Sequence, residues 1–281
     1  IIVENEDKCT APKLTMAQIT ALSIVVMAVR DAVRLPIGLS CGSLNYEFAF
    51  SLAKIADCQF VRVPVFVDTV MNHTGIVTPC SQQVVHCRKM VGAEDIKIFA
   101  DVQVKHYYML NPNIPITASA DWAVNQGADA IIVTGASTGM ETPLDDLRQV
   151  KKRVPIPVVA GSGVTETNIK EQLGAADLLI VGSSLRKDGC FGNPIDAQRA
   201  AKLVCAAGLA FLLARRAGAP RRGLTWDCGY AQTTGRMQYT AGSFAQTIVL
   251  LFSRVLRPQV RPPHVTRLFP APSHTHSHVD E

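Results

Sequence analysis

Three stretches of the sequence decide the fold: ADAIIVTG at 128–135, PIPVVAGSG at 155–163 and ADLLIVGSS at 176–184. Each is a short apolar run that ends in glycine, serine or threonine. Strands that are apolar throughout are typical of a parallel sheet covered on both faces. The same pattern reaches back to residue 1. It predicts strands at 1–3, 36–39, 60–63, 96–102, 130–134, 157–160 and 178–181, and helices at 15–34, 46–56, 81–91, 116–126, 144–153 and 166–173.

Seven alternating strand–helix units predict an α/β fold, a TIM-type (β/α)8 barrel that lacks its first strand. An open doubly wound sheet is the alternative. The barrel is favoured because two glycine-rich turns follow the last two strands, where barrels bind phosphate. We expect a truncated barrel over 1–204, followed by an irregular basic tail over 205–281 that carries a short apolar stub. The sequence opens inside a strand, so the natural N-terminus is expected to be missing.

The charge distribution separates these two parts. Residues 1–202 hold 19 Lys and Arg against 20 Asp and Glu, whereas residues 203–281 hold nine Arg against three acidic residues. The net charge of +5 therefore belongs to the tail, and a nucleic-acid partner is not expected.

Cysteine usage and hydropathy indicate the compartment. The eight cysteines form no CxxC pair, which favours a reduced, cytoplasmic setting.

Two apolar segments could be mistaken for membrane spans. Residues 14–33 carry their apolar side chains on one stripe, as a half-buried helix does. The apolar run at 203–214 falls short of the ~20 residues that a membrane helix needs.

Two motifs at adjacent strand ends predict phosphate binding. Gly161, Ser162 and Gly163 follow one predicted strand, and Gly182 and Ser183 follow the next. Glycine lets backbone N–H groups approach an anion without an intervening Cβ, and the helix that follows presents its positive end. The alternative is that both motifs are ordinary tight turns without a ligand. We expect the phosphate of a sugar phosphate or nucleotide to bind here, with no cofactor.

A second group follows the strand at 96–102. Asp101, Lys105 and His106 lie on the side of a barrel that carries active sites, and they could support acid–base or Schiff-base chemistry. A solvated loop with incidental charges is the competing interpretation.

Further polar residues lie at strand ends. Glu4 and Asn5 end the first strand, and Thr134 ends the sixth. Arg62 lies inside an apolar strand, where an unpaired charge is costly, so it should meet Glu4, Asp101 or a substrate anion. No metal site is expected, because the alternating histidines His274, His276 and His278 lie in a tail without fixed geometry.

These motifs resemble the BtpA family over residues 1–204. The resemblance rests on VEN at 3–5, FVRV at 60–63, KIFADVQVKH at 97–106, IVTG at 132–135, GSGVT at 161–165 and the stretch from Asp177 to Gly189. It implies a barrel, and a role in accumulating or stabilising photosystem I at the thylakoid membrane.

The chain departs from the family pattern at three points. Ser40 and Pro64 stand where asparagines are expected, and Thr78-Pro79 replaces an acidic residue after Gly75-Ile76. These departures favour a non-catalytic assembly factor for a membrane complex. The alternatives are an enzyme that acts on a phosphorylated small molecule, and a non-functional chimera whose open sheet edges favour aggregation or homo-oligomers.

The tail resembles a different family. TWDCGY at 225–230 and RMQYTAGSFA at 236–245 look like the C-terminal part of proton-conducting membrane subunits of formate-hydrogenlyase-type complexes. The resemblance implies a joined reading frame or a fusion that tethers the barrel to a membrane.

Overall fold

The computed structural model describes residues 1–4, 13–73, 75–190, 192–216, 259–260 and 277–278 of the 281-residue chain. Residues up to 216 belong to one compact unit. A second unit holds the antiparallel strands β11 (Gln259–Val260) and β12 (Ser277–His278). Most of the predicted tail lies outside the described residues, including the motifs at 225–230 and 236–245, so its resemblance stays a prediction.

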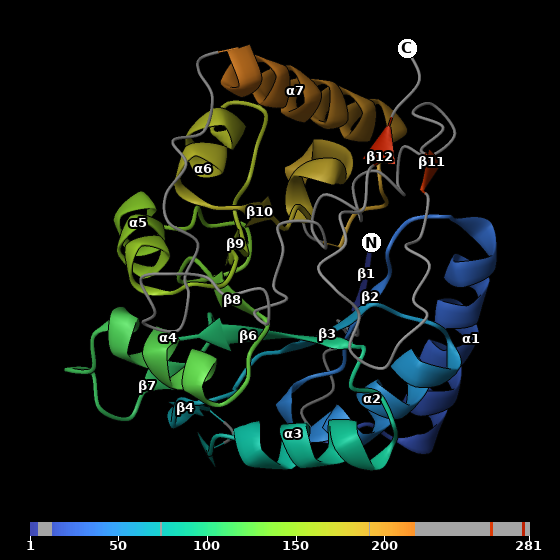
Figure 1. Ribbon diagram of the computed structural model, residues 1–281, viewed down its shortest axis with the longest axis vertical. Coiled ribbons are helices and arrows are strands. Elements are labelled where there is room, and N and C mark those ends of the chain that lie inside the picture. Colours follow the sequence, from blue (N-terminus) through green and yellow to red (C-terminus); the bar gives the residue numbers. More distant parts are fainter. Residues whose placement is uncertain (5–12, 74, 191, 217–258, 261–276, 279–281) are drawn as a thin grey trace, which may run out of the picture. The chain divides into compact units, whose positions relative to one another are not determined.

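The first unit is built on a curled, parallel, seven-stranded sheet whose spatial order follows the chain order. Helices surround it as an outer layer (Figure 1). The strands are β1 (Ile2–Glu4), β2 (Gly38–Ser40), β3 (Phe60–Val63), β6 (Lys97–Val102), β8 (Ala130–Val133), β9 (Val158–Ala160) and β10 (Leu178–Leu179). The helices are α1 (Met16–Ala32), α2 (Tyr46–Ile55), α3 (Ser81–Met90), α4 (Ile116–Asn125), α5 (Leu144–Arg153), α6 (Ile169–Ala175) and α7 (Ala197–Arg216).

This order confirms the predicted α/β barrel type. In an open doubly wound sheet the strand order reverses at a switch point, and here it runs from β1 to β10 without reversal. β1 and β10 are the two ends of the sheet within the described residues, which fits a barrel short of one strand. Helix α7 runs through the predicted boundary between 204 and 205.

Alternate residues of β8 and β9 serve two cores, which explains why these two strands are apolar throughout. In β8, Ile131 and Val133 pack under the helices. Ala130 and Ile132 pack with Val159 in a separate inner cluster. Gly38 faces Phe60, and a Cβ at that glycine would lie 2.1 Å from the phenyl ring. Glycine at this position therefore makes room for an aromatic side chain.

Polar residues clamp the amino-terminal ends of the strands. The side chains of Gln59, Asp129 and Asp177 precede β3, β8 and β10. They accept the backbone N–H of Ile37 (2.7 Å), Ile98 (2.9 Å) and Val158 (2.9 Å), respectively. Each residue thus ties its own strand to the strand before it. This end of the sheet is occupied by structural contacts, so the opposite end is the one that carries the candidate site.

Sequence reasoning missed a second, smaller sheet. It is antiparallel and consists of β5 (Gly75–Val77), β4 (Val70–Asn72) and β7 (Tyr108–Met109), in that order. β4 and β5 follow β3, and β7 follows β6, so both parts extend from the carboxyl ends of barrel strands.

No helix within the described ranges is long and apolar enough to cross a bilayer. The predicted half-buried helix at 14–33 is α1, whose Leu22 and Val26 are buried. The apolar run at 203–214 is the second half of α7, and it packs against the barrel through Leu203.

Candidate functional site

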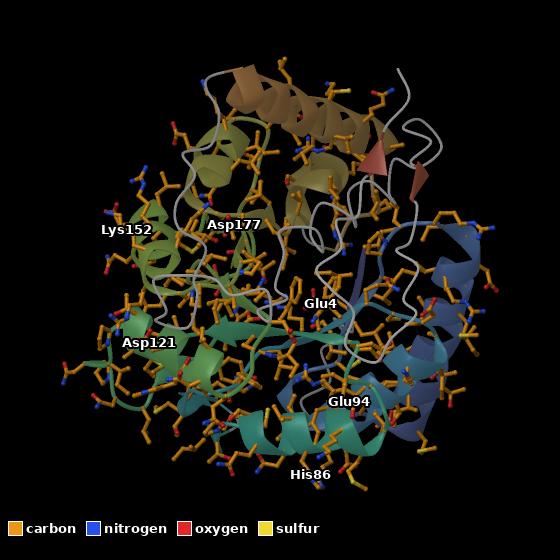
Figure 2. All side chains as sticks on the ribbon, in the orientation of Figure 1. Glu4, His86, Glu94, Asp121, Lys152 and Asp177 are labelled. Atoms are coloured by element: carbon orange, nitrogen blue, oxygen red, sulfur yellow. The ribbon has the colours of Figure 1, made fainter. Side chains whose placement is uncertain are left out.

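The carboxyl ends of the first four barrel strands carry a cluster of charges. Glu4, Ser40 and Arg62 are register partners on β1, β2 and β3, so their side chains point the same way. Asp101 lies on β6, the next strand of the sheet. In Figure 2, Glu4 lies near the middle of the view, whereas Asp121 and Lys152 lie on the outer helices α4 and α5.

Arg62 is the centre of this charged cluster. Its Nε donates to Asp101 Oδ1 (2.9 Å), and a terminal nitrogen donates to Asp101 Oδ2 (2.7 Å). The other terminal nitrogen donates to Glu4 Oε1 (3.2 Å). The guanidinium is 3% exposed and the Asp101 carboxylate 0% exposed. The sequence left open whether Arg62 meets Glu4, Asp101 or a substrate anion, and the structure gives it both carboxylates.

The two carboxylates therefore differ in what they can reach. Both oxygens of Asp101 are held by Arg62 in a buried, bidentate pair. Burial raises the pKa of Asp101, and the nearby Arg62 and Lys105 charges lower it in part. Glu4 is 35% exposed, and Ser40 Oγ donates to its Oε1 (3.0 Å). Asp101 is thus placed to position Arg62, and Glu4 is the carboxylate of the cluster that solvent reaches.

The loop after β6 holds Lys105 and His106 in an unusual backbone conformation. Gln103 (φ 47°) and His106 (φ 69°) both lie in the left-handed region, which is uncommon for residues other than glycine. The backbone N–H of Lys105 donates to Thr134 Oγ1 (3.0 Å). Thr134 therefore fixes the loop after β6 and is itself 8% exposed.

His106 reaches the next loop. Its Nε2 lies 2.8 Å from Thr138 Oγ1. Burial, together with the Lys105 charge, lowers the pKa of His106, so the imidazole is neutral near pH 7. A neutral imidazole is the form that accepts a proton.

Sequence reasoning missed Asp68, a buried carboxylate that anchors the same loop. It accepts the backbone N–H of Gln103 (2.7 Å) and the hydroxyl of Ser119 (2.6 Å), and it is 3% exposed. Burial raises the pKa of Asp68. The pattern that singled out Arg62, an ionisable residue in an apolar run, applies equally to Asp68 at the end of VPVFVD (63–68).

The glycine-rich half of the site lies at the ends of β8, β9 and β10. Gly163 (φ +67°) packs so closely on the loop at 135–142 that a Cβ would lie 2.3 Å from the Glu141 backbone. Ser162 Oγ donates to the Met140 carbonyl (2.8 Å) and accepts the Gly135 N–H (2.8 Å). The hydroxyl of Ser162 is therefore committed to joining two loops.

The loops after β9 and β10 lie side by side. Ser184 Oγ donates to the Val164 carbonyl. A Cβ built on Gly139 would lie 3.8 Å from Ser183 Oγ. Among the described residues, no atom lies within 4 Å of a Cβ built on Gly182, so this part of the chain leaves open space beside it.

Several backbone N–H groups remain available at these loop ends. Gly182 precedes a short 3₁₀ helix at Ser183–Leu185. The N–H groups of Gly163, Gly182, Ser183 and Ser184 donate to no acceptor within the described part of the chain. Free amides at the start of a helical turn are the arrangement that binds an anion.

Eleven of the twelve predicted site residues thus lie at the carboxyl ends of the barrel strands or in the loops that follow them. Asn5 lies outside the described residues. The functional roles of all twelve stay predictions. His274 and His276 also lie outside the described residues.

Comparison with known proteins agrees with these motifs. The model of the BtpA family matches residues 1–208. The photosystem I biogenesis protein BtpA of Synechocystis sp. is 31% identical over 208 residues, which cover 73% of this chain and 72% of that protein. An uncharacterised protein of Methanocaldococcus jannaschii is 33% identical over 198 residues, which cover 70% and 73%.

Among solved structures, phosphoribosylanthranilate isomerase from Thermus thermophilus is similar to this chain with a TM-score of 0.47 and 15% identity. The likeness covers 75% of this chain and 86% of that one. The family match spans well over half of the sequence, and it includes every motif on which the resemblance was based. The chain belongs to the BtpA family.

Proposed function

We propose that this chain binds the phosphate of a phosphorylated small molecule at the ends of β9 and β10, and that it acts in the biogenesis or stabilisation of a membrane protein complex. The phosphate half of the proposal is supported by the free N–H groups of Gly163, Gly182, Ser183 and Ser184 beside open space. The second half is supported by family membership and by the name of the Synechocystis relative, a photosystem I biogenesis protein. The proposal puts the chain in the cytoplasm, at the periphery of a membrane.

The single observation that carries the phosphate site is the opening at Gly182. Gly161 and Gly163 after β9 are packed against protein, whereas Gly182 adjoins open space within the described part of the chain. In that part, the N–H groups of Gly182, Ser183 and Ser184 donate to no acceptor. A dianionic phosphate accepts several such donors at once, and these donors need no reorganisation on binding.

The test uses two glycines in matched surroundings. Gly182→Asp places a carboxylate among the free amides, so it should repel phosphate and abolish binding. Gly174→Asp is the control, because Gly174 in α6 is also exposed and also has no atom within 4 Å of a built Cβ. Isothermal titration with inorganic phosphate and with ribose 5-phosphate measures both variants. Equal affinities for the two variants would refute the site.

An enzyme is the second candidate, favoured by the charged cluster that faces the glycine-rich half. Lys105 lies near Asp101, and its charge offsets part of the rise in pKa that burial causes in that carboxyl. Neutral His106 and solvent-exposed Glu4 are then the groups able to move a proton, with Lys105 able to stabilise an oxyanion or to form a Schiff base.

Borohydride trapping tests the Schiff-base version. A phosphorylated ketose or aldose, mixed with the protein and borohydride, should leave a covalent adduct on Lys105 that mass spectrometry locates. Lys97, which is exposed and paired with Asp129, is the internal comparison. An adduct spread equally over Lys97 and Lys105, or none on Lys105, would remove this version.

A further inference from the structure

The loop that follows β8, residues 135–142, lies against both loops that carry the proposed phosphate-binding amides. We call it the support loop. A Cβ built on Gly163 would lie 2.3 Å from the backbone of Glu141, so the loop after β9 packs directly on it. A Cβ built on Gly139 would lie 3.8 Å from Ser183 Oγ, so the loop after β10 is also its neighbour. A shift of the support loop would therefore displace both sets of amides.

One buried side chain from α6 holds the end of the support loop. Gln172 is 0% exposed, and its Nε2 donates to Glu141 Oε1 (2.9 Å) and to the Thr142 carbonyl (3.0 Å). A side-chain amide has two N–H hydrogens, so both are used on consecutive residues of this loop. The residue whose backbone supports Gly163 is thus fixed through its side chain as well.

The oxygen of the same amide has no partner. Within the described residues, Gln172 Oε1 is buried and accepts no hydrogen bond. A buried polar atom without a partner costs stability, so an apolar side chain would suit this position in the core better. The other buried positions of α6, Ile169 and Ala175, are apolar. The contacts with Glu141 and Thr142, rather than core packing, therefore account for a glutamine here.

The remaining contacts of the support loop join it to another loop. Ser162 Oγ donates to the Met140 carbonyl (2.8 Å), and Thr142 Oγ1 donates to the Ser162 carbonyl (3.2 Å). Ser162 lies in the loop after β9, so it would move together with the site. Gln172 lies in a helix anchored in the core, so its two hydrogen bonds give the support loop a fixed reference.

We propose that Gln172 is a positioning residue of the phosphate site: it holds Glu141 and Thr142 so that the amides of Gly163 and Ser183 converge on one anion. It acts through the support loop, because its hydrogen bonds go to that loop and to none of the amides. The inference rests on the proposed phosphate site and adds the residue that keeps the loops of that site in place.

The experiment measures binding of inorganic phosphate to the full chain by isothermal titration. Gln172→Met keeps the length of the side chain and removes both N–H donors. It should weaken binding by about tenfold, the effect of losing one hydrogen bond to a charged group. Gln59→Met is the matched control, because the Gln59 side chain also holds backbone, accepting the Ile37 N–H (2.7 Å) at the opposite end of the strands. This variant should keep the wild-type affinity.

A second pair of variants changes the exposed partner of Gln172. Glu141→Gln and Glu141→Ala remove the same negative charge from the vicinity of the anion, so charge does not distinguish them. Glu141→Gln keeps an oxygen that accepts from Gln172 Nε2, and Glu141→Ala does not. Phosphate should therefore bind more weakly to Glu141→Ala than to Glu141→Gln. Because Glu141 is exposed, neither substitution removes core packing.

Amide ¹⁵N spectra without phosphate separate positioning from a general loss of stability. Gln172→Met should shift the signals of Gly163 and Ser183, and Gln59→Met should leave them in place. The inference is overturned if Gln172→Met binds phosphate as tightly as the wild type, if both glutamine variants lose affinity equally, or if the two Glu141 variants bind alike. A wild type that does not bind phosphate would instead refute the proposed site, and this inference with it.

Discussion

The two halves of the barrel mouth use different chemistry. On the β1–β6 side, Glu4, Arg62 and Asp101 form a charged cluster held by side-chain contacts. On the β8–β10 side, the loops at 161–163 and 182–184 present backbone N–H groups and small side chains. The first half depends on buried ion pairs, and the second on close backbone packing. One chain thus holds a half rich in unpaired backbone amides, where we propose that an anion binds, and an ionisable half at the same end of the sheet.

The largest loss of folding stability is expected from removing the Arg62–Asp101 ion pair of the charged half. Arg62→Leu leaves the Asp101 carboxylate buried without its partner, and it should lower the free energy of unfolding by about 3–5 kcal/mol. Arg153→Leu removes an exposed partner of Asp121 and should cost at most about 1 kcal/mol. Urea denaturation measures both variants. If both variants lose the same small amount of stability, the Arg62–Asp101 pair is not shielded from solvent.

The glycine-rich half should lose stability when a side chain is added at a glycine whose backbone is closely packed. Gly163→Ala forces a Cβ against the Glu141 backbone at a positive φ, and it should cost about 1–3 kcal/mol. Gly174→Ala lies in a helix with free space and should stabilise the protein by up to about 1 kcal/mol. Thermal unfolding compares the two substitutions. If Gly163→Ala is tolerated as well as Gly174→Ala, the packing of the loop after β9 on residues 135–142 is not as described.

A smaller effect is expected on the pH dependence of folding stability, through the buried carboxylate of Asp68. Burial raises the folded-state pKa of Asp68, so the folded state binds a proton more tightly than the unfolded state. This group therefore contributes stability below its unfolded pKa, and that contribution is lost as pH rises through the folded pKa. Asp68→Asn should remove this part of the pH dependence.

The comparison requires stability curves of wild type and Asp68→Asn from pH 4 to pH 7. The stability of the wild type relative to the variant should increase as pH falls. A difference that is constant across this range would contradict the raised pKa of Asp68.

Most barrel elements could be predicted from local sequence. The strand at 60–63 and the helix at 144–153 match the structure residue for residue, because apolar periodicity and flanking prolines mark their ends. The strand expected at 178–181 is shorter, Leu178–Leu179, because only one neighbour in the described residues pairs with it.

The small sheet could not be predicted in the same way. β4 has three residues and β7 two, which is too short for a period to appear. Their pairing joins Met71 to Tyr108 across the chain, and no local pattern encodes that contact.

The position of the candidate residues at the carboxyl ends of the strands was predictable from the sequence, and their contacts were predictable only in part. Arg62 drew attention as a charge in an apolar strand, and Asp101 and Glu4 were named as its candidate partners. The sequence could not show that both oxygens of Asp101 are occupied by Arg62 or that Ser162 Oγ joins two loops, because these facts depend on side-chain geometry.

The most direct test of the anion-binding half is a ¹⁵N-amide NMR titration of the full chain with inorganic phosphate. We expect saturable shifts centred on the amides of Gly163, Gly182, Ser183 and Ser184, and small shifts at residues 60–63. Shifts confined to the charged cluster, or an absence of saturable shifts at these four amides, would contradict this expectation.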